Sequence, residues 1–316
     1  MVLHLQKTFK EPVGLCDPCY WNNFIHMLHP GKRITRQEAG SKVLSWEEGR
    51  LISDRLRGKK PVSQDTPSRA GIMDVLVPFL QLLVLLLTLP LHLLALLGFW
   101  QPMCKTYFPY LMANLTERAN KKMESKKREL FSQIKDLKGT SGKVTLLELG
   151  CGTGANFQFY PSDCKITCVD PNPNFEKFLT KSMAKNRHLE YERFIVAYGE
   201  DMKQLADSSM DVVVCTLVLC SVQSPKKVLQ EIQRVLRPGG LLFFWEHVAE
   251  PRESWAYLWQ RVFEPTWKHI GDGCNLTRET WKDLEKAGFF NVQMEWQPPL
   301  FKWLPVGPHI MGKAVK

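Results

Sequence analysis

The sequence predicts an α/β protein with a largely parallel sheet, helices on both faces and an apolar segment before it. From Lys143 onward, strand patterns alternate with amphipathic helical patterns, which is typical of such a sheet. A glycine-rich turn follows the first strand pattern directly, in the stretch LLELGCGTGANFQFYP. Upstream, residues 75–104 form a run of 30 residues without Asp, Glu, Lys or Arg.

Residues 1–72 show no sustained hydrophobic period and many polar breaks, so we expect a poorly ordered N-terminal extension. Cys16 and Cys19 form a C-x2-C pair that resembles half of a metal knuckle. The gap to His26 and His29 is too short for the usual zinc finger. We therefore predict no metal site, here or elsewhere in the chain.

Residues 73–104 are predicted to be a hydrophobic membrane anchor. About 20 apolar residues span a bilayer, and a buried helix of a soluble protein is rarely apolar on every face. Pro78 and Pro90 each remove a helix hydrogen bond and bend the axis. A straight anchor, a kinked anchor and a shallow hairpin therefore all remain open.

Residues 105–142 are predicted to form a basic amphipathic linker helix. One helical face carries four apolar residues, namely Met123, Leu130, Ile134 and Leu137. Basic residues cluster on this side of the anchor: Lys105, Arg118, Lys121, Lys122, Lys126, Lys127 and Arg128. By the positive-inside tendency this flank is cytoplasmic. A solvated connecting helix and a helix in contact with lipid remain alternatives.

Seven strands are predicted in the domain at 143–316. They cover residues 144–150, 165–170, 191–197, 211–217, 241–247, 292–297 and 310–315. Helical patterns lie between many of them, for example over 172–186 and 224–236. In such sheets, ligands bind at the carboxyl ends of the strands.

The glycine-rich turn predicts a bound cofactor close to the backbone. Gly150, Gly152 and Gly154 lack the Cβ atoms that would keep a ligand away. With Ala155, the same turn also matches the dinucleotide fingerprint. The turn alone therefore leaves the cofactor open.

Acidic residues at or after the ends of three strands help to identify the cofactor. Glu148 precedes the turn, where a carboxylate suits a ligand ammonium group or fixes the loop, and would repel a pyrophosphate. Asp170 ends the second strand and can accept hydrogen bonds from two ribose hydroxyls. After the third strand, Asp201 can accept from an adenine amino group while Met202 packs on the ring.

Together, these motifs resemble the class I S-adenosylmethionine-dependent methyltransferases. The resemblance covers residues 143–316 and implies a Rossmann-like, mostly parallel seven-stranded sheet with S-adenosyl-L-methionine as the cofactor. The residues that would bind this cofactor are Glu148, Gly150, Cys151, Gly152, Gly154, Asp170, Asp201, Met202 and Leu217.

The stretches VFEPTWKHIGDGC and GPHIMGKAVK, with the anchor and the linker, resemble the methyltransferase-like thiol S-methyltransferases. This implies methyl transfer to small apolar alkyl thiols, with hydrogen sulfide as a further candidate acceptor. It also implies attachment to the endoplasmic reticulum membrane and lipid droplets, with the catalytic domain in the cytosol. The resemblance does not cover residues 1–72.

Composition is compatible with these expectations. The chain has 316 residues and a formal charge of +10, and no dense basic block alternates with aromatic residues, so nucleic acid is not an expected partner. Several of the nine cysteines lie in apolar strand patterns, including Cys168 and Cys215, as is typical of reduced thiols facing the cytosol. No obligate protein partner is inferred.

Catalysis of thiol methylation needs no strong protein base, because a thiolate is already a good nucleophile and free thiols ionise near pH 8.5. His247 is a candidate base, although we favour a role in orienting a loop. The residues predicted to contact substrate are Cys220, Glu246, Trp255, Trp259 and Trp267. For the aromatic residues, ordinary core packing is the alternative.

Two rival functions remain open at this point. One is a methyltransferase acting on oxygen or carbon of a lipid or quinone. The other is a non-enzymatic lipid-droplet scaffold, which the intact set of Glu148, Asp170 and Asp201 argues against.

Overall fold

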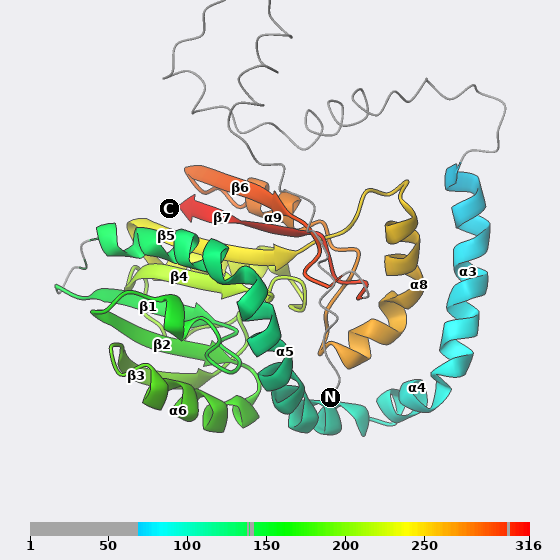
Figure 1. Ribbon diagram of the computed structural model, residues 1–316, viewed down its shortest axis with the longest axis horizontal. Helices are drawn as coiled ribbons and strands as arrows, with labels where there is room; N and C mark the ends of the chain where they lie inside the picture. Colours follow the sequence, from blue (N-terminus) through cyan, green and yellow to red (C-terminus); the bar gives the residue numbers. More distant parts are fainter. Residues whose placement is uncertain (1–68, 138, 140–141, 302–303) are drawn as a thin grey trace, which may run out of the picture. The chain divides into compact units, whose positions relative to one another are not determined.

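A seven-stranded sheet forms the centre of the computed structural model, which describes residues 69–137, 139, 142–301 and 304–316 (Figure 1). The strands are β1 Val144–Leu149, β2 Cys164–Asp170, β3 Glu190–Val196, β4 Met210–Thr216, β5 Leu236–His247, β6 Asn291–Gln297 and β7 His309–Val315. Their order is β3-β2-β1-β4-β5-β7-β6, and only β7 pairs antiparallel with its neighbours. The predicted class I methyltransferase fold is confirmed. The predictions for Cys16, Cys19 and nearly all of the N-terminal extension lie outside the described residues.

Strand β5 begins earlier than the predicted residue 241. Leu236 pairs with Met210 of β4 before a register shift, so the turn-like LRPGG stretch belongs to the strand. A Cβ at Gly240 would lie 2.9 Å from the carbonyl oxygen of Arg237, which explains the glycine in this irregular part. The other six strands begin and end within one residue of their predicted bounds.

The central strands of the sheet are buried on both faces. Leu146, Val212 and Phe243 point toward one hydrophobic cluster. Their neighbours in the strands, such as Leu147 and Val213, point toward the other. This two-sided burial explains why the central strands are almost continuously apolar.

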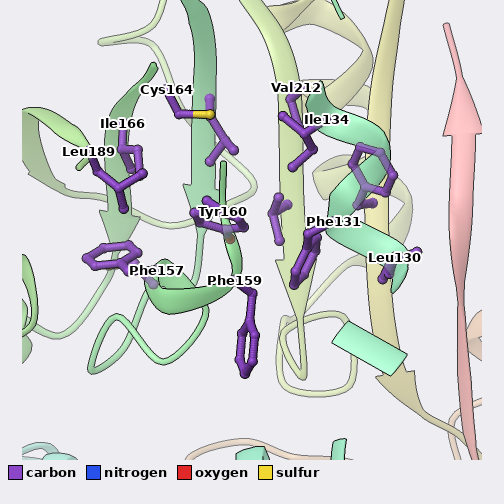
Figure 2. Packing of buried hydrophobic residues seen from close by; sticks show 14 of the residues in the cluster. Leu130, Phe131, Ile134, Phe157, Phe159, Tyr160, Cys164, Ile166, Leu189 and Val212 are labelled. Atoms are coloured by element: carbon purple, nitrogen blue, oxygen red, sulfur yellow. The ribbon is translucent and has the colours of Figure 1, made fainter. Parts of the chain in front are cut away.

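Helix α5 (Trp100–Ser132) covers the first face, followed by the short η1 (Gln133–Asp136). Its residues Leu130 and Phe131, with Ile134 of η1, pack on the sheet and on Phe157 and Tyr160 (Figure 2). The apolar face predicted for the linker is therefore part of the domain core and is not a lipid-contacting face. The helix also runs through the predicted boundary between 104 and 105.

The remaining helices follow the strands. They are η2 Phe157–Phe159, η3 Pro173–Phe175, α6 Glu176–Lys185, α7 Pro225–Val235, α8 Trp255–Ile270 and α9 Thr280–Lys286. Helices α7 and α8 begin at serine caps, because Ser224 Oγ accepts from the backbone N–H of Lys227 and Ser254 Oγ from that of Tyr257. Both helical patterns taken from the sequence are confirmed.

The apolar segment forms two helices, α3 (Arg69–Leu87) and α4 (Leu89–Leu96), with a break at Thr88. Pro90 lies in the first turn of α4, where proline is tolerated. Among the described residues, no single helix has the length and hydropathy needed to cross a membrane. Leu76–Leu87 and Leu89–Leu96 meet that test only as a pair, bent by 77°.

Helix α3 packs against α8, far along the chain (Figure 1). Val77 lies in a small cluster with Leu258 and Val262 of α8. Near the break, the hydroxyls of Thr88 and Thr266 lie 3.1 Å apart. The apolar helix is thus attached to the catalytic domain through side chains on one face, and its other face stays exposed.

Candidate active site

A cavity of about 600 Å³ lies at the carboxyl ends of β1, β2 and β4. Its walls are α5, the glycine-rich turn after β1, the segments after β2, β3 and β4, and the loop after α8. This is the edge of the sheet at which parallel α/β folds bind ligands.

Two of the three predicted glycines pack against protein. Gly150 has a φ of +61°, and a Cβ there would lie 2.3 Å from Val218 Cγ2. Gly154 has a φ of +70°, and its Cβ would lie 2.6 Å from Phe157 Cε2. Both glycines allow the turn to fold closely against its neighbours.

Gly152 instead faces open space. A Cβ at this position would find no atom closer than 3.8 Å, and the residue lines the cavity. Cys151 lines it as well, and burial raises the pKa of its thiol, so it stays a neutral wall group. The turn therefore presents bare backbone to the cavity, as a closely approaching cofactor requires.

Asp170 holds this turn in place from the end of β2. Its Oδ2 accepts from the backbone N–H of Gly152 at 3.1 Å, and its Oδ1 from that of Asn172 at 2.9 Å. Burial raises the pKa of its carboxyl to about 6, while the two backbone N–H groups oppose that rise. Each oxygen keeps a further lone pair for a ligand hydroxyl.

A buried charge network forms the wall behind β1. Lys127 of α5 donates to Asn120 Oδ1 at 2.8 Å and to Asn156 Oδ1 at 2.7 Å. Asn156 Nδ2 in turn donates to Glu148 Oε1 at 2.7 Å, and the hydroxyl of Tyr160 donates to Glu148 Oε2. Burial lowers the pKa of Lys127 and raises that of Glu148, while their mutual attraction works against both shifts.

Lys127 belongs to the basic cluster predicted beside the anchor, for which a solvated face and lipid contact were the alternatives, and the structure instead buries it in the cavity wall. Lys127 lies four residues after Met123 and three before Leu130, both on the buried face of α5. This helical spacing places the lysine on the apolar face, and it could have indicated from the sequence that Lys127 is buried. Asn120 and Asn156 had no comparable sequence signal and were missed.

The predicted adenine contacts after β3 are placed differently. Glu200 lines the cavity, and its Oε1 accepts from the backbone N–H groups of Gln223 and Ser224 at 2.8 and 3.2 Å. Asp201 does not line it; its carboxylate pairs with Lys203 in solvent. Met202 is buried in the core on the far face of the sheet.

The turn after β4 contributes the predicted Leu217, which lines the cavity with a φ of +58°. Its backbone N–H donates to the carbonyl of Trp245 at 2.8 Å. Glu246 is fully buried behind this turn and accepts from the backbone N–H of Val218 at 3.0 Å. Glu246 therefore positions the wall and does not itself line the cavity.

Six residues predicted to contact substrate or act as a base lie outside the cavity lining. In addition to Glu246, Cys220 and His247 are buried behind the wall. Trp267 donates through Nε1 to Cys274 Sγ at 3.2 Å. Trp255 and Trp259 are exposed on α8, 55% and 46% of their maximal area, so neither the pocket nor the core interpretation describes them.

Known proteins are similar to this chain in sequence. Residues 147–244 match a methyltransferase domain. The chain is 87% identical over 244 residues to the thiol S-methyltransferase TMT1B of Rattus norvegicus, covering 77% of this chain and 100% of that protein. For the human TMT1B the identity is 82% with the same coverage. The human thiol S-methyltransferase TMT1A is 57% identical over 220 residues, 70% of this chain and 90% of that protein.

The cavity fits the cofactor of such enzymes, since it offers an open backbone at Gly152, acceptors at Asp170 and Glu200, and a charged wall at Glu148 and Lys127. Because the chain covers its relatives over their whole or nearly whole length, their shared fold and domain extend to it. This chain belongs to the thiol S-methyltransferase family and is an S-adenosylmethionine-dependent methyltransferase.

Proposed function

We propose that the protein transfers the methyl group of S-adenosyl-L-methionine to the sulfur of small apolar alkyl thiols. The observation that carries this proposal is the family relationship to thiol S-methyltransferases over their full length, at 82–87% identity. The cavity supports it, because its polar wall is continuous with an apolar wall at Phe108 and Met112 of α5.

Two groups of residues would bind the two ends of the cofactor, its nucleoside and its amino-acid end. Asp170 would accept from the ribose hydroxyls, and Glu200 is the acceptor suited to the adenine amino group. The wall of Glu148 and Lys127 would bind the charged amino-acid end. The bound cofactor supplies a methyl group on a positive sulfur, so the protein's part is to hold this methyl in line with the acceptor.

The acceptor side needs little acid–base help. A thiol ionises near pH 8.5, and its thiolate is a strong nucleophile. His247 does not line the cavity, and its Nε2 lies 2.9 Å from Cys274 Sγ. This contact supports a positioning role for His247, so a direct base is not part of the proposal.

The acceptor is tested with the purified full chain and labelled cofactor. Alkyl thiols are offered beside matched alcohols, catechols and quinols. We expect methylation of the thiols, with a rate at low thiol concentration that rises toward the pKa of each thiol. Methylation of oxygen or carbon with the thiols untouched would overturn the proposal in favour of a lipid or quinone substrate.

Cofactor binding is tested separately, by calorimetry. Asp170→Ala removes charge-assisted hydrogen bonds and should weaken binding by more than about 100-fold, with unchanged circular dichroism. Unchanged affinity would remove Asp170 from the site. Absence of any cofactor binding by the wild-type chain would instead favour the scaffold function.

We further propose that α3 and α4 attach the chain to the endoplasmic reticulum membrane or the lipid-droplet surface, with the catalytic domain in the cytosol. Side chains exposed on the pair are mostly apolar, including Phe79, Leu86 and Leu96. A continuous apolar surface of this kind favours burial in lipid. Trp255 and Trp259 expose indole rings on α8, beside α3, as is typical of membrane interfaces.

Attachment is tested with Leu86→Lys/Leu96→Lys in the full chain. These side chains are exposed, so the lysines should leave the fold intact and shift most of the protein from floated membranes to the soluble fraction. Phe290→Lys is the matched control, because Phe290 is 91% exposed and lies outside the helix pair. Continued flotation of the double variant would contradict the proposal.

Orientation is tested at the sequons Asn114-Leu-Thr116 and Asn275-Leu-Thr277. Asn114 is exposed on α5 and would be open to glycosylation in the lumen. For a cytosolic domain both sites stay unmodified. A glycosidase-sensitive mass shift in the wild-type chain would overturn the cytosolic orientation.

A further inference from the structure

Two thiols and an imidazole form a buried cluster behind the cavity wall. Cys220 follows β4, His247 ends β5 and Cys274 follows α8. Their possible ligand atoms all lie within 4.8 Å of one another. Nothing in the proposed methyl transfer uses these three groups together.

The surrounding backbone fixes the positions of the cluster. The backbone and side-chain N–H groups of Asn275 donate to the carbonyl oxygen of Cys220 at 2.9 and 3.0 Å. Arg278 donates to the carbonyls of Leu219 and Val222, on either side of Cys220, at 2.6 and 2.7 Å. Because these hydrogen bonds fix the backbone beside Cys220, its position in the cluster is set before any ligand binds.

Hydrogen bonding alone leaves the cluster incompletely satisfied. Thiols are weak donors and acceptors, yet a thiol is the neighbour of His247 Nε2. Within the described part of the chain, Nδ1 of the same ring has no partner. The weak thiol contact at Nε2 calls for an explanation, and an ion bound at Nε2 is one.

The donor set matches a zinc-class ion. Zinc binds sulfur at about 2.3 Å and imidazole nitrogen at about 2.0–2.1 Å, so tetrahedral ligands lie roughly 3.5–3.8 Å apart. The ligand atoms here lie within 4.8 Å of one another, so side-chain shifts of about 1 Å or less would form such a site. Two thiolates neutralise a divalent ion, which makes the loaded site compatible with full burial. The indole N–H of Trp267 donates to Cys274 Sγ, as outer groups do to a metal-bound thiolate.

We propose that Cys220, His247 and Cys274 bind a zinc-class divalent ion that joins the turn after β4, the end of β5 and the loop after α8. Ser221 and Gly273, the sequence neighbours of the two cysteines, both line the cavity. The ion would therefore hold two segments of the cavity wall in register. This inference revises the expectation, drawn from the sequence, that the chain has no metal site.

The test measures metal directly on the purified full chain, independently of methyl transfer. Because Cys16 and Cys19 form a separate C-x2-C pair, all variants carry Cys16→Ser and Cys19→Ser. After chelation, the protein is titrated with Zn²⁺ and, in parallel, with Co²⁺. We expect one equivalent per chain, with thiolate-to-cobalt charge transfer and the visible bands of tetrahedral cobalt.

Cys220→Ser and Cys274→Ser should each weaken Zn²⁺ binding at least about 100-fold, because each removes a thiolate ligand that a serine hydroxyl replaces poorly. Cys164→Ser is the matched control, since Cys164 is equally buried on β2 and lies outside the cluster. It should bind the metal normally. The proposal is overturned by no bound equivalent in the parent chain, by equal binding in Cys274→Ser, or by a Cys220–Cys274 disulfide found by mass spectrometry.

Discussion

The cavity wall and the solvent-facing surface beside it use the same side-chain types for different purposes. Lys127 is buried and donates to two asparagines, whereas Lys126 next to it forms an exposed ion pair with Glu295. Asp170 is buried and accepts from two backbone N–H groups, whereas Asp201 pairs with Lys203 in solvent.

The difference shows what burial does to a charged group. In solvent, water satisfies a charge and an ion pair adds little. In the wall, every donor and acceptor needs a protein partner, so the groups fix each other's positions before a ligand arrives. Matched variants of wall and surface residues should therefore differ in both stability and cofactor affinity.

The largest difference is expected between Lys127→Met and Lys126→Met. The first change leaves two buried asparagine oxygens without a donor and removes the cation whose attraction lowers the pKa of Glu148. We expect a loss of about 3 kcal/mol in the free energy of unfolding, measured in urea. Lys126→Met should change it by less than about 0.5 kcal/mol.

The double variant Lys127→Met/Glu148→Gln sharpens this result. Replacing the Glu148 carboxyl as well should recover part of the stability, because this carboxyl no longer has a neighbouring cation to offset its burial. Equal effects of the two single lysine variants would show that Lys127 is not held in the wall.

The next difference is expected between two glycines of the same turn. Gly150→Ala places a Cβ 2.3 Å from Val218 Cγ2 and should cost about 2 kcal/mol or more of stability. Gly152→Ala meets only ordinary contacts, with no atom closer than 3.8 Å, so its cost of about 1 kcal/mol comes from the positive φ. Its methyl group enters the cavity and should weaken cofactor binding more than about 10-fold by calorimetry. Normal cofactor affinity in Gly152→Ala would place the cofactor elsewhere.

The fold was predictable because its signals are local. The central strands are apolar runs bounded by turns, and the glycine-rich turn identified the first strand as the one that leads into the cofactor site. The start of β5 was predicted too late because pairing of Leu236 with Met210 depends on a neighbouring strand. The break at Thr88 lay among the alternatives that the two prolines left open.

The site was predictable only where one residue carries its own signal. Glu148 and Asp170 stand at the ends of strands and the glycines directly follow one, so spacing identified them. Lys127 was misassigned because its charge outweighed its place on the apolar stripe. Cys274 was not singled out at all, because only the folded chain brings it to Cys220 and His247.

The pH dependence of stability should also separate wall from surface. Burial raises the pKa of Glu148 to about 8 from its ordinary 4.5. Such a group stabilises the fold fully below its unfolded pKa, and this stabilisation is lost as pH rises through the folded value. The free energy of unfolding should therefore fall between about pH 5 and pH 8.

Glu148→Gln removes this titrating group. Its fall in unfolding free energy over the same range should be smaller than that of the wild type by more than about 1 kcal/mol. In the variant, Asp170, whose pKa is raised to about 6, should still make the unfolding free energy fall somewhat with pH. Parallel curves for the wild type and the variant would mean that Glu148 is ionised throughout and fully compensated by its partners.

The smallest effect is expected for Asp201→Asn, the residue that the sequence proposed as the adenine acceptor. Its carboxylate is about half exposed and faces Lys203, so cofactor affinity should change less than about twofold. Glu200→Gln should weaken cofactor binding about fivefold, because Glu200 lines the cavity and an amide binds the N–H groups of Gln223 and Ser224 less strongly. Calorimetry on both variants decides between the two residues. A large loss in Asp201→Asn with Glu200→Gln unaffected would restore the original assignment and require this segment to rearrange when the cofactor binds.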